Sequence, residues 1–425
     1  MWQSTARYPL SRFEGEAMID PSAPLPRPRS DLTEPPDAPQ ALSGALGVLQ
    51  GRMLLQVSPA RVGYLRGQLD AGRSGLVLCG KNALRKAKRL REEEQFSGPL
   101  LVDPAVYEVR AASEEEPFPP ASEDTFAFDD PLEVSLAEQR AVGVTAPVTP
   151  TGYIRAEDSD ALKAAVRRVA DLDDAQVVFA APVDVGWLRE EDAVRQLIAC
   201  LRLVKGPKAI MLGGQMDPLA RHGRAVDHLR RVIEEVPGAA LLRTDLAAFG
   251  ALAAGASFTA FGAGSRLRHI VAPGEKAKTS KGFSTSPHVL FAELMDFFLG
   301  KTLADRFAGA PAPVCGCAVC EGVWALDEFA SNAGERPARA AAHNVAVLME
   351  WLRTLTAITP GLARQQWWHE HCGAAVERYP LVNAQLRQPD AFKVPQQLKQ
   401  WALAAPASVA DGANGQTAAN HQRRS

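Results

Sequence analysis

Short, unbroken apolar runs alternate with amphipathic stretches through most of this chain. The runs that we predict to be strands are LVLCG (76–80), PLLVDP (99–104), TAPVTP (145–150), QVVFAAP (176–182), KAIMLGG (208–214), AALLRT (239–244) and SFTAFG (257–262), with PHVLF (287–291) as a less regular eighth. Stretches between them, such as EEDAVRQLIACLRLV, carry apolar residues at spacings of three and four, which is typical of helices. Continuous apolar strands joined by helices indicate a parallel sheet whose outer face is covered by helices.

About eight such units favour a closed (β/α)8 barrel of the TIM type, with a doubly wound open sheet as the alternative. In either fold, functional side chains lie at the carboxyl ends of the strands. Asp103, Asp184, Gln215 and Asp245 each come directly after a predicted strand, or close the end of one. We therefore expect them at the functional edge of the sheet.

Composition and apolar pattern divide the chain into four parts. Residues 1–45 are rich in proline and charge without an apolar period, and residues 405–425 are small and polar, so we predict a disordered leader and a disordered tail. Between them we predict a barrel over 46–311. A metal-binding subdomain with the C-terminal helices follows over 312–404.

Composition limits the class of protein. With 46% hydrophobic and 23% charged residues, the chain has the make-up of an ordinary globular protein. It contains no apolar run of about 18 residues, and its first residues lack the apolar segment of a secretory signal. Cys79 and Cys200 lie in apolar patterns and are predicted core residues. These features predict a location in the reducing cytoplasm.

A net charge of −2 gives no overall field that would attract a polyanion, so any contact with nucleic acid must come from a local cluster. One such cluster lies in SRLRHIVAPGEKAKTSKG, which contains Arg266, Arg268, Lys276, Lys278 and Lys281. Because this segment follows a predicted strand, we predict that it contacts phosphates at the functional edge. A solvated loop is the alternative.

Three cysteines lie close together in VCGCAVC, and a histidine follows them in AAAHNVAVLMEWL. Cys315, Cys317 and Cys320 form C-x-C-x2-C, and His343 falls near the start of an amphipathic stretch. A disulfide is disfavoured, because Cys315 and Cys317 are too close to pair without strain and three thiols leave one over. Three thiolates and one imidazole form a closed tetrahedral set, so we predict one structural zinc ion. The alternative is three partly buried thiols beside a helix-capping histidine.

A C-x-C-x2-C set followed by a histidine in an H-N-hydrophobic helix, after a (β/α)8 pattern, resembles the tRNA-guanine transglycosylase superfamily. This superfamily includes the queuine and archaeosine transglycosylases and relatives that insert 7-deazaguanines into DNA. The similarity covers residues 76–352 and is strong at the cysteine and histidine positions. It implies a reaction in which a carboxylate attacks the sugar C1′ and a 7-deazaguanine then displaces it.

The resemblance also implies two catalytic aspartates. Asp103, in LLVDPAVYE, takes the place of the aspartate in the family's T-D-S-G-G-F, without that motif's glycines, and is predicted to move protons; a turn former is the alternative. GASFTAFGAGSR matches the family's nucleophile motif G-x-D-x-F-D but has Ser257 and Ala260 at the two aspartate positions. Asp245 is then the predicted replacement nucleophile, with an ordinary helix N-cap as the alternative.

Substrate contacts are predicted from the same strand ends. Asp184 could bond a guanine-like base edge, Trp187 could stack on a base, and Gln215 could supply an amide; a strand-end aspartate and a core tryptophan are the alternative. WWHEHC (367–372) is predicted to anchor the C-terminal helices through its aromatic rings rather than to bind a second metal.

Two functions remain from these features. The first is a divergent transglycosylase that exchanges guanine for a 7-deazaguanine base in tRNA or DNA, with Asp103 and Asp245 as its carboxylates. The second is a catalytically inactive, zinc-containing accessory subunit or nucleic-acid-binding protein of the same fold, acting as a homo- or heterodimer. Convergence of two of Asp103, Asp184 and Asp245 on one pocket would favour the enzyme, and separation would favour the accessory protein.

Overall fold

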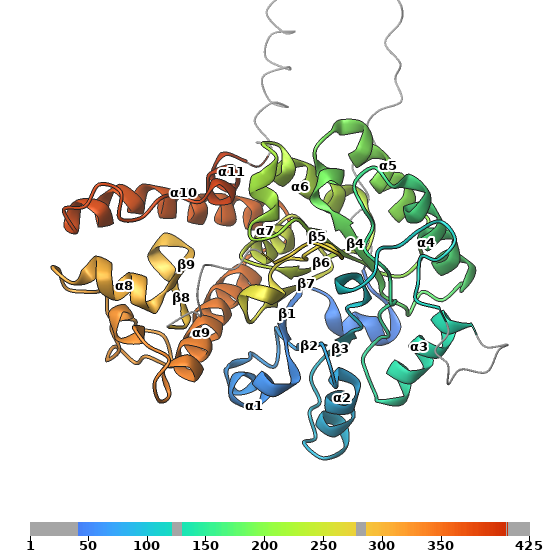
Figure 1. The fold of residues 1–425 in the computed structure, drawn as a ribbon, viewed down its shortest axis with the longest axis horizontal. Helices are drawn as coiled ribbons and strands as arrows, with labels where there is room; N and C mark the ends of the chain where they lie inside the picture. Colours follow the sequence, from blue (N-terminus) through green and yellow to red (C-terminus); the bar gives the residue numbers. More distant parts are fainter. Residues whose placement is uncertain (1–40, 121–129, 278–285, 405, 407–425) are drawn as a thin grey trace, which may run out of the picture. The chain divides into compact units, whose positions relative to one another are not determined.

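Seven parallel strands form one sheet in the order β3-β2-β1-β7-β6-β5-β4 (Figure 1). The computed structural model describes residues 41–120, 130–277, 286–404 and 406. The strands are β1 (Arg52–Val57), β2 (Leu76–Cys79), β3 (Leu100–Asp103), β4 (Phe179–Asp184), β5 (Lys208–Gly213), β6 (Ala239–Thr244) and β7 (Phe258–Gly262). An α/β fold with a parallel, half-barrel sheet confirms the coarse part of the prediction.

Alternation along each strand divides the core into two clusters. Leu55 and Val57 of β1 belong to a cluster shared with the helices, whereas Leu54 belongs to a second cluster on the opposite, inner face. Ala260 of β7 lies in this inner cluster and is fully buried. Both faces of the sheet are therefore apolar, which is why the strands read as unbroken apolar runs.

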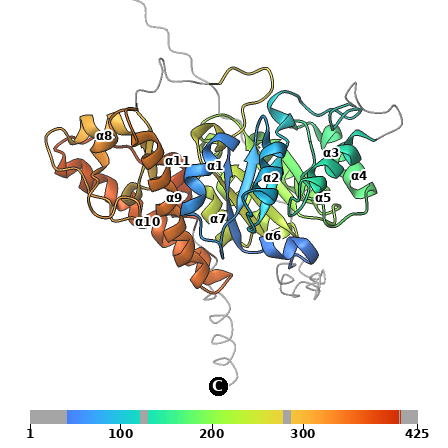
Figure 2. The same ribbon diagram turned by 90° about the horizontal axis from the view of Figure 1, so that it is seen from below.

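Helices cover the outer face of the sheet and follow the strands along the chain (Figures 1 and 2). They are α1 (Val62–Leu65), α2 (Ala83–Glu92), α3 (Pro131–Ala141), α4 (Ser159–Asp171), α5 (Glu191–Leu201), α6 (Ala225–Glu235) and α7 (Ala247–Ala253). Asp130 and Asp158 cap α3 and α4 through bonds to backbone amides. Among the described helices, none is long and apolar enough to cross a membrane.

Two predicted strands differ in the structure. Residues 145–150 are not a strand: Thr145 N bonds Leu100 O of β3 at 2.8 Å, and Val148 forms only an isolated bridge to Val178. Pro147 and Pro150 remove the backbone donors that a regular ladder needs. Residues 288–291 do form a strand, but it pairs outside the main sheet, so a closed sheet of eight strands is not what the structure has.

One strand was missed. The first predicted strand begins at residue 76, yet β1 precedes it in the chain and lies between β2 and β7 in the sheet. Leu46 and Leu49, in the turn before β1, are buried in the inner cluster. This turn is the 3-10 helix Gly44–Leu49, whose first two residues belong to the predicted leader, 1–45. The rest of that leader up to residue 40, and almost all of the predicted tail, lie outside the described residues.

The C-terminal part combines a hairpin with four helices. Strands β8 (His288–Phe291) and β9 (Asp296–Leu299) pair in antiparallel fashion, and α8 (Gly300–Phe307), α9 (Arg336–Ala357), α10 (Leu362–Gln385) and α11 (Gln396–Leu403) follow. Helix α9 contacts α1, and α10 contacts α7. Trp368 stacks on Phe249 of α7 with ring centroids 5.6 Å apart, which confirms the aromatic anchor predicted for WWHEHC.

Candidate functional site

The four predicted metal ligands come together in the C-terminal part. His343 Nδ1 lies 3.4 Å from Cys315 Sγ, 3.5 Å from Cys317 Sγ and 3.4 Å from Cys320 Sγ. All four ligand atoms lie within 4.8 Å of one another. Zinc bonds of about 2.3 Å to sulfur and about 2.0 Å to nitrogen, at tetrahedral angles, separate S and N by about 3.5 Å. The cluster can therefore hold a metal ion and is compatible with zinc.

A second contact orients the histidine. His343 Nε2 lies 3.0 Å from the carbonyl oxygen of Leu290 in β8. When this nitrogen carries the proton and donates, Nδ1 keeps its lone pair for a metal. The next residue, Asn344, accepts from Leu290 N at 2.7 Å and donates to His288 O at 2.9 Å. Helix α9 therefore holds the backbone of β8 at both His288 and Leu290.

Asp103 lies at the carboxyl end of β3 within a buried polar network. Its Oδ2 accepts from Gln56 Nε2 at 2.7 Å and from the Tyr107 hydroxyl, and its Oδ1 accepts from Ala105 N at 2.9 Å. Burial raises the pKa of this carboxyl, against a lowering by the nearby Arg243 charge. The side chain is fully buried. The bond to Ala105 N is the contact expected if Asp103 forms a turn, which was the alternative to a role in proton transfer.

Arg243 of β6 fills the space next to Asp103. Its guanidinium donates to His269 O at 3.0 Å, to the Tyr107 hydroxyl at 2.9 Å and to Arg266 O at 3.1 Å, and it pairs with Glu108. The sheet register between β6 and β7 shifts around this residue, whose φ of 51° is unusual for a non-glycine residue. This irregularity turns the guanidinium toward the carboxyl edge of the sheet. An arginine with all its donor nitrogens engaged is not available to a substrate.

Neither of the two positions predicted to match the family's nucleophile motif carries a carboxylate. Ser257 precedes β7 and is buried at the amino end of the strand, where its backbone carbonyl accepts from Gly51 N at 2.7 Å. Ala260 lies in the inner cluster and is fully buried.

Asp184, Trp187 and Gln215 lie apart from this network. Asp184 accepts from the Tyr153 hydroxyl at 2.6 Å and from Gly186 N at 2.7 Å. Trp187 is fully buried and donates to Arg155 O, so the predicted stacking role is wrong and the core alternative holds. Gln215 bonds Glu275 and the Lys276 carbonyl, which ties the loop after β7 to the end of β5.

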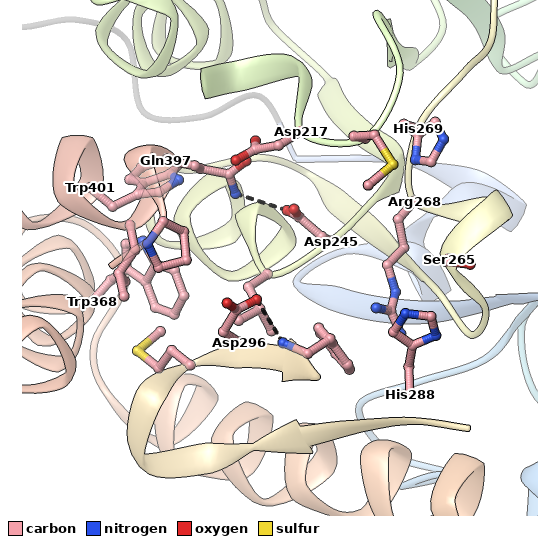
Figure 3. Close-up of a pocket in the computed structure, with 16 residues that line it drawn as sticks. Asp217, Asp245, Ser265, Arg268, His269, His288, Asp296, Trp368, Gln397 and Trp401 are labelled. Carbon is pink, nitrogen blue, oxygen red and sulfur yellow. Dashed lines mark hydrogen bonds between the residues drawn. The ribbon is translucent and has the colours of Figure 1, made fainter. Parts of the chain in front are cut away.

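Asp245 lies in a different cavity of about 240 Å³ (Figure 3). Its Oδ1 accepts from Ala247 N and from Gln397 Nε2, both at 2.9 Å. Asp245 is not the N-cap that the alternative predicted, because the N-cap of α7 is Leu246, and the bond to Ala247 N is a turn contact just before the helix. Asp217 and Asp296 line the same cavity. Burial, reinforced by the charge of Asp245, raises the pKa of Asp217 and of Asp296 to about 7 each.

Asp103, Asp184 and Asp245 therefore belong to three separate hydrogen-bond networks, and the structure does not bring them together. Sequence reasoning missed Asp217 and Asp296, because nothing in GGQMD or LMDFF marks two aspartates that only the tertiary fold places beside Asp245. Arg243 was missed as well. Its one available signal was a charged residue inside the otherwise apolar run AALLRT.

A second cavity, of about 590 Å³, lies over the carboxyl ends of β1, β2, β6 and β7 and against α9. Its lining includes four arginines, Arg61, Arg243, Arg266 and Arg268, and one acid, Glu108. We call it the arginine cavity. Arg61 and Arg266 are exposed, and within the described part of the chain no carboxylate lies at salt-bridge distance from either.

The residues of the predicted phosphate-binding cluster differ in exposure. Arg266 lines the arginine cavity, and Lys276 is exposed in the loop tied to Gln215. Arg268 also lines the arginine cavity, but it is buried, with its guanidinium 3.5 Å from the ring centre of Phe297. Lys278 and Lys281 lie outside the described residues.

Cys79 and Cys200 match their predicted role as core residues. Cys79 and Cys200 are buried, and burial raises the pKa of both thiols, which suits core residues rather than nucleophiles.

Comparison with family models and with curated proteins finds no match for this chain.

Proposed function

We propose that this protein is a zinc-containing, nucleic-acid-binding relative of the transglycosylases that does not itself exchange bases. The observation that carries the proposal is the position of Arg243 beside Asp103. Where the family's reaction needs an open carboxylate pair, this chain has a carboxylate bonded to Gln56 and Tyr107 and an arginine with its donors engaged. Ala260 has no group that could attack a sugar carbon.

The metal site supports the zinc part of the proposal. Three thiolates and one histidine fill a tetrahedral shell and leave no place for an activated water, so the ion would be structural. We also propose that the sheet is a divergent (β/α)8 barrel in which residues 145–154 replace a strand. In support, this segment bonds Leu100 at the β3 edge and bridges Val178 and Val183 on the β4 side.

The arginine cavity supports the nucleic-acid part. Arg61 and Arg266 are exposed cations that line a wide cavity, and the family that the sequence resembles acts on tRNA or DNA. Phosphate contacts of this kind release counterions, so binding should fall steeply with salt and depend little on sequence.

The test combines binding and chemistry. Arg61→Ala with Arg266→Ala should weaken binding to tRNA, single strands and duplex DNA by similar factors and reduce the salt slope by about two. Arg85→Ala, which removes an exposed arginine from α2, serves as the matched control and should change neither.

The same preparations are incubated with a guanine-containing strand, with and without a 7-deazaguanine base, and run on a denaturing gel. We expect no covalent complex and no exchanged base by nucleoside mass spectrometry. A trapped complex that is lost in Asp245→Asn would overturn the proposal in favour of an enzyme with a relocated nucleophile. Absence of nucleic-acid binding at low salt would overturn the nucleic-acid-binding part of the proposal.

A further inference from the structure

The cavity around Asp245 is not used by the proposed function. It lies between the carboxyl ends of β5 to β7 and the C-terminal part, so Asp217 and Asp245 line one side and Asp296 of β9 lines the other (Figure 3). Its volume of about 240 Å³ is below the usual range for drug-sized ligands, which starts at roughly 300 Å³. Any ligand here must be small.

One oxygen in this cavity has no partner. Asp217 Oδ1 is shielded from solvent and makes no hydrogen bond within the described part of the protein. Leaving a buried acceptor unsatisfied costs about 1–3 kcal/mol, so such groups in native proteins call for an explanation. A donor supplied by a ligand would satisfy it.

Arg268 is a second and independent sign of a ligand. It is 9% exposed and lines the cavity, and its Nε donates to Gly262 O at 3.0 Å. The guanidinium lies face-on to Phe297, at 3.5 Å from the ring centre, with Phe261 at 5.0 Å. Its two Nη groups have no hydrogen-bond partner among the residues that the structure describes. A buried, fixed fork of donors suits a carboxylate.

The charges in the cavity call for a ligand with both signs. His269 and His288 also face it, and burial, aided by neighbouring arginines, lowers the pKa of both rings, so they add no cation at neutral pH. Asp217 and Asp296, each with a pKa raised to about 7, add less than full negative charge. What remains is an acidic group of three aspartates facing one guanidinium.

A metal ion does not fit this arrangement. Among the described residues, the only group of three or more ligating side chains placed to hold one ion is that of Cys315, Cys317, Cys320 and His343. The three aspartates are therefore spread over more than one coordination sphere. A ligand that meets them must itself have extent and carry its charges at separate atoms.

We propose that this cavity binds a small zwitterion, an α-amino acid with an apolar or aromatic side chain. Its ammonium group would donate to Asp217 and Asp245, and its carboxylate would accept from the Nη groups of Arg268. Trp368 and Trp401 line the same cavity and provide apolar surface for the side chain. This inference is independent of nucleic-acid binding.

Isothermal titration calorimetry with L-phenylalanine, L-leucine and L-methionine tests the proposal on the full-length protein. At least one of the three should bind saturably. For L-phenylalanine, the matched arms are 2-phenylethylamine, which lacks the carboxylate, and 3-phenylpropanoate, which lacks the amine. Each should bind at least tenfold more weakly, equivalent to about 1.4 kcal/mol.

Asp217→Asn and Arg268→Met should each weaken binding of the amino acid at least tenfold, whereas Asp192→Asn on the exposed surface of α5 should leave it unchanged. If Arg268→Met fails to fold, Asp217→Asn and the two one-charge arms still decide. No saturable binding of any of the three amino acids at millimolar concentration would overturn the proposal. Equal binding of the amine alone, or wild-type affinity in Asp217→Asn, would overturn it too.

Discussion

Replacing Arg243 by methionine removes the cation of the buried network and keeps an unbranched apolar side chain in its place. The guanidinium donates to two backbone carbonyls, the Tyr107 hydroxyl and the Cys79 sulfur, and pairs with Glu108; its Nη1 lies 3.9 Å from Asp103 Oδ2. The side chains of Arg243 and Asp103 are 4% and 0% exposed, so water cannot replace these contacts. The variant should therefore be strongly destabilised.

The magnitude follows from what is left behind. Breaking a buried ion pair by removing one partner costs about 3–5 kcal/mol, because a charge stays buried without compensation. Glu108 is 39% exposed and regains water, so it adds little. We expect a loss of about 3–5 kcal/mol in the free energy of unfolding, and a smaller cost for Asp103→Asn in the Arg243→Met background than in the wild type.

Equilibrium urea denaturation, followed by tryptophan fluorescence, measures both changes from the shift in midpoint at constant slope. Arg195→Met is the control, because it removes an arginine from an exposed pair with Asp192 and should change stability by less than about 0.5 kcal/mol. A loss below about 1 kcal/mol for Arg243→Met would show that the network is solvated or rearranged in solution. In that case Arg243 would not be held by buried partners beside Asp103, and it could be available to a substrate.

Three further outcomes can be measured. Chelation, or Cys317→Ser, should lower the metal content to near zero and lower the melting temperature, with hydrogen exchange rising first in residues 312–352; a metal-free protein of unchanged stability would refute this. Asp217 and Asp296 keep protons in the folded state that the unfolded chain releases, so stability should fall as pH rises from about 4 to about 7 and level off above it. Asparagine at both positions should flatten that pH profile, and an unchanged profile would contradict the assignment. Gly250→Val should loosen the C-terminal helices, because a Cβ there would lie 2.5 Å from the Trp401 ring and 2.7 Å from Trp368 Nε1; limited proteolysis reports the change, and wild-type resistance would refute it.

The parts of the fold that could be predicted are those set by local pattern. Strands β2 to β7 coincide with apolar runs, because a sheet buried on both faces has mostly apolar side chains in its strands. The metal ligands were found because C-x-C-x2-C is a local spacing, and one added histidine completes the set. Neither inference needed knowledge of distant contacts.

What could not be predicted depends on contacts between distant segments. Gln56 made β1 look less apolar than its neighbours, yet that amide is buried because it bonds Asp103 and the Arg243 backbone. The left-handed conformation of Arg243 has no signature in AALLRT. The prediction of Asp103 and Asp245 as a catalytic pair relied on both being strand-end residues, and this position does not determine which carboxylates share a cavity.

Asn344 links the candidate metal site to the hairpin of β8 and β9. Through this side chain and the contact of His343 with Leu290, helix α9 fixes the β8 backbone, while His288 of the same strand lines both cavities. The hairpin thus connects the candidate metal site to Asp296 at the start of β9. Suppose that a bound metal raises the affinity of the cavity around Asp245 for its ligand by some factor. Thermodynamic reciprocity then requires that the bound ligand raise the affinity for the metal by the same factor. Availability of the ion would then regulate how tightly the protein holds small molecules.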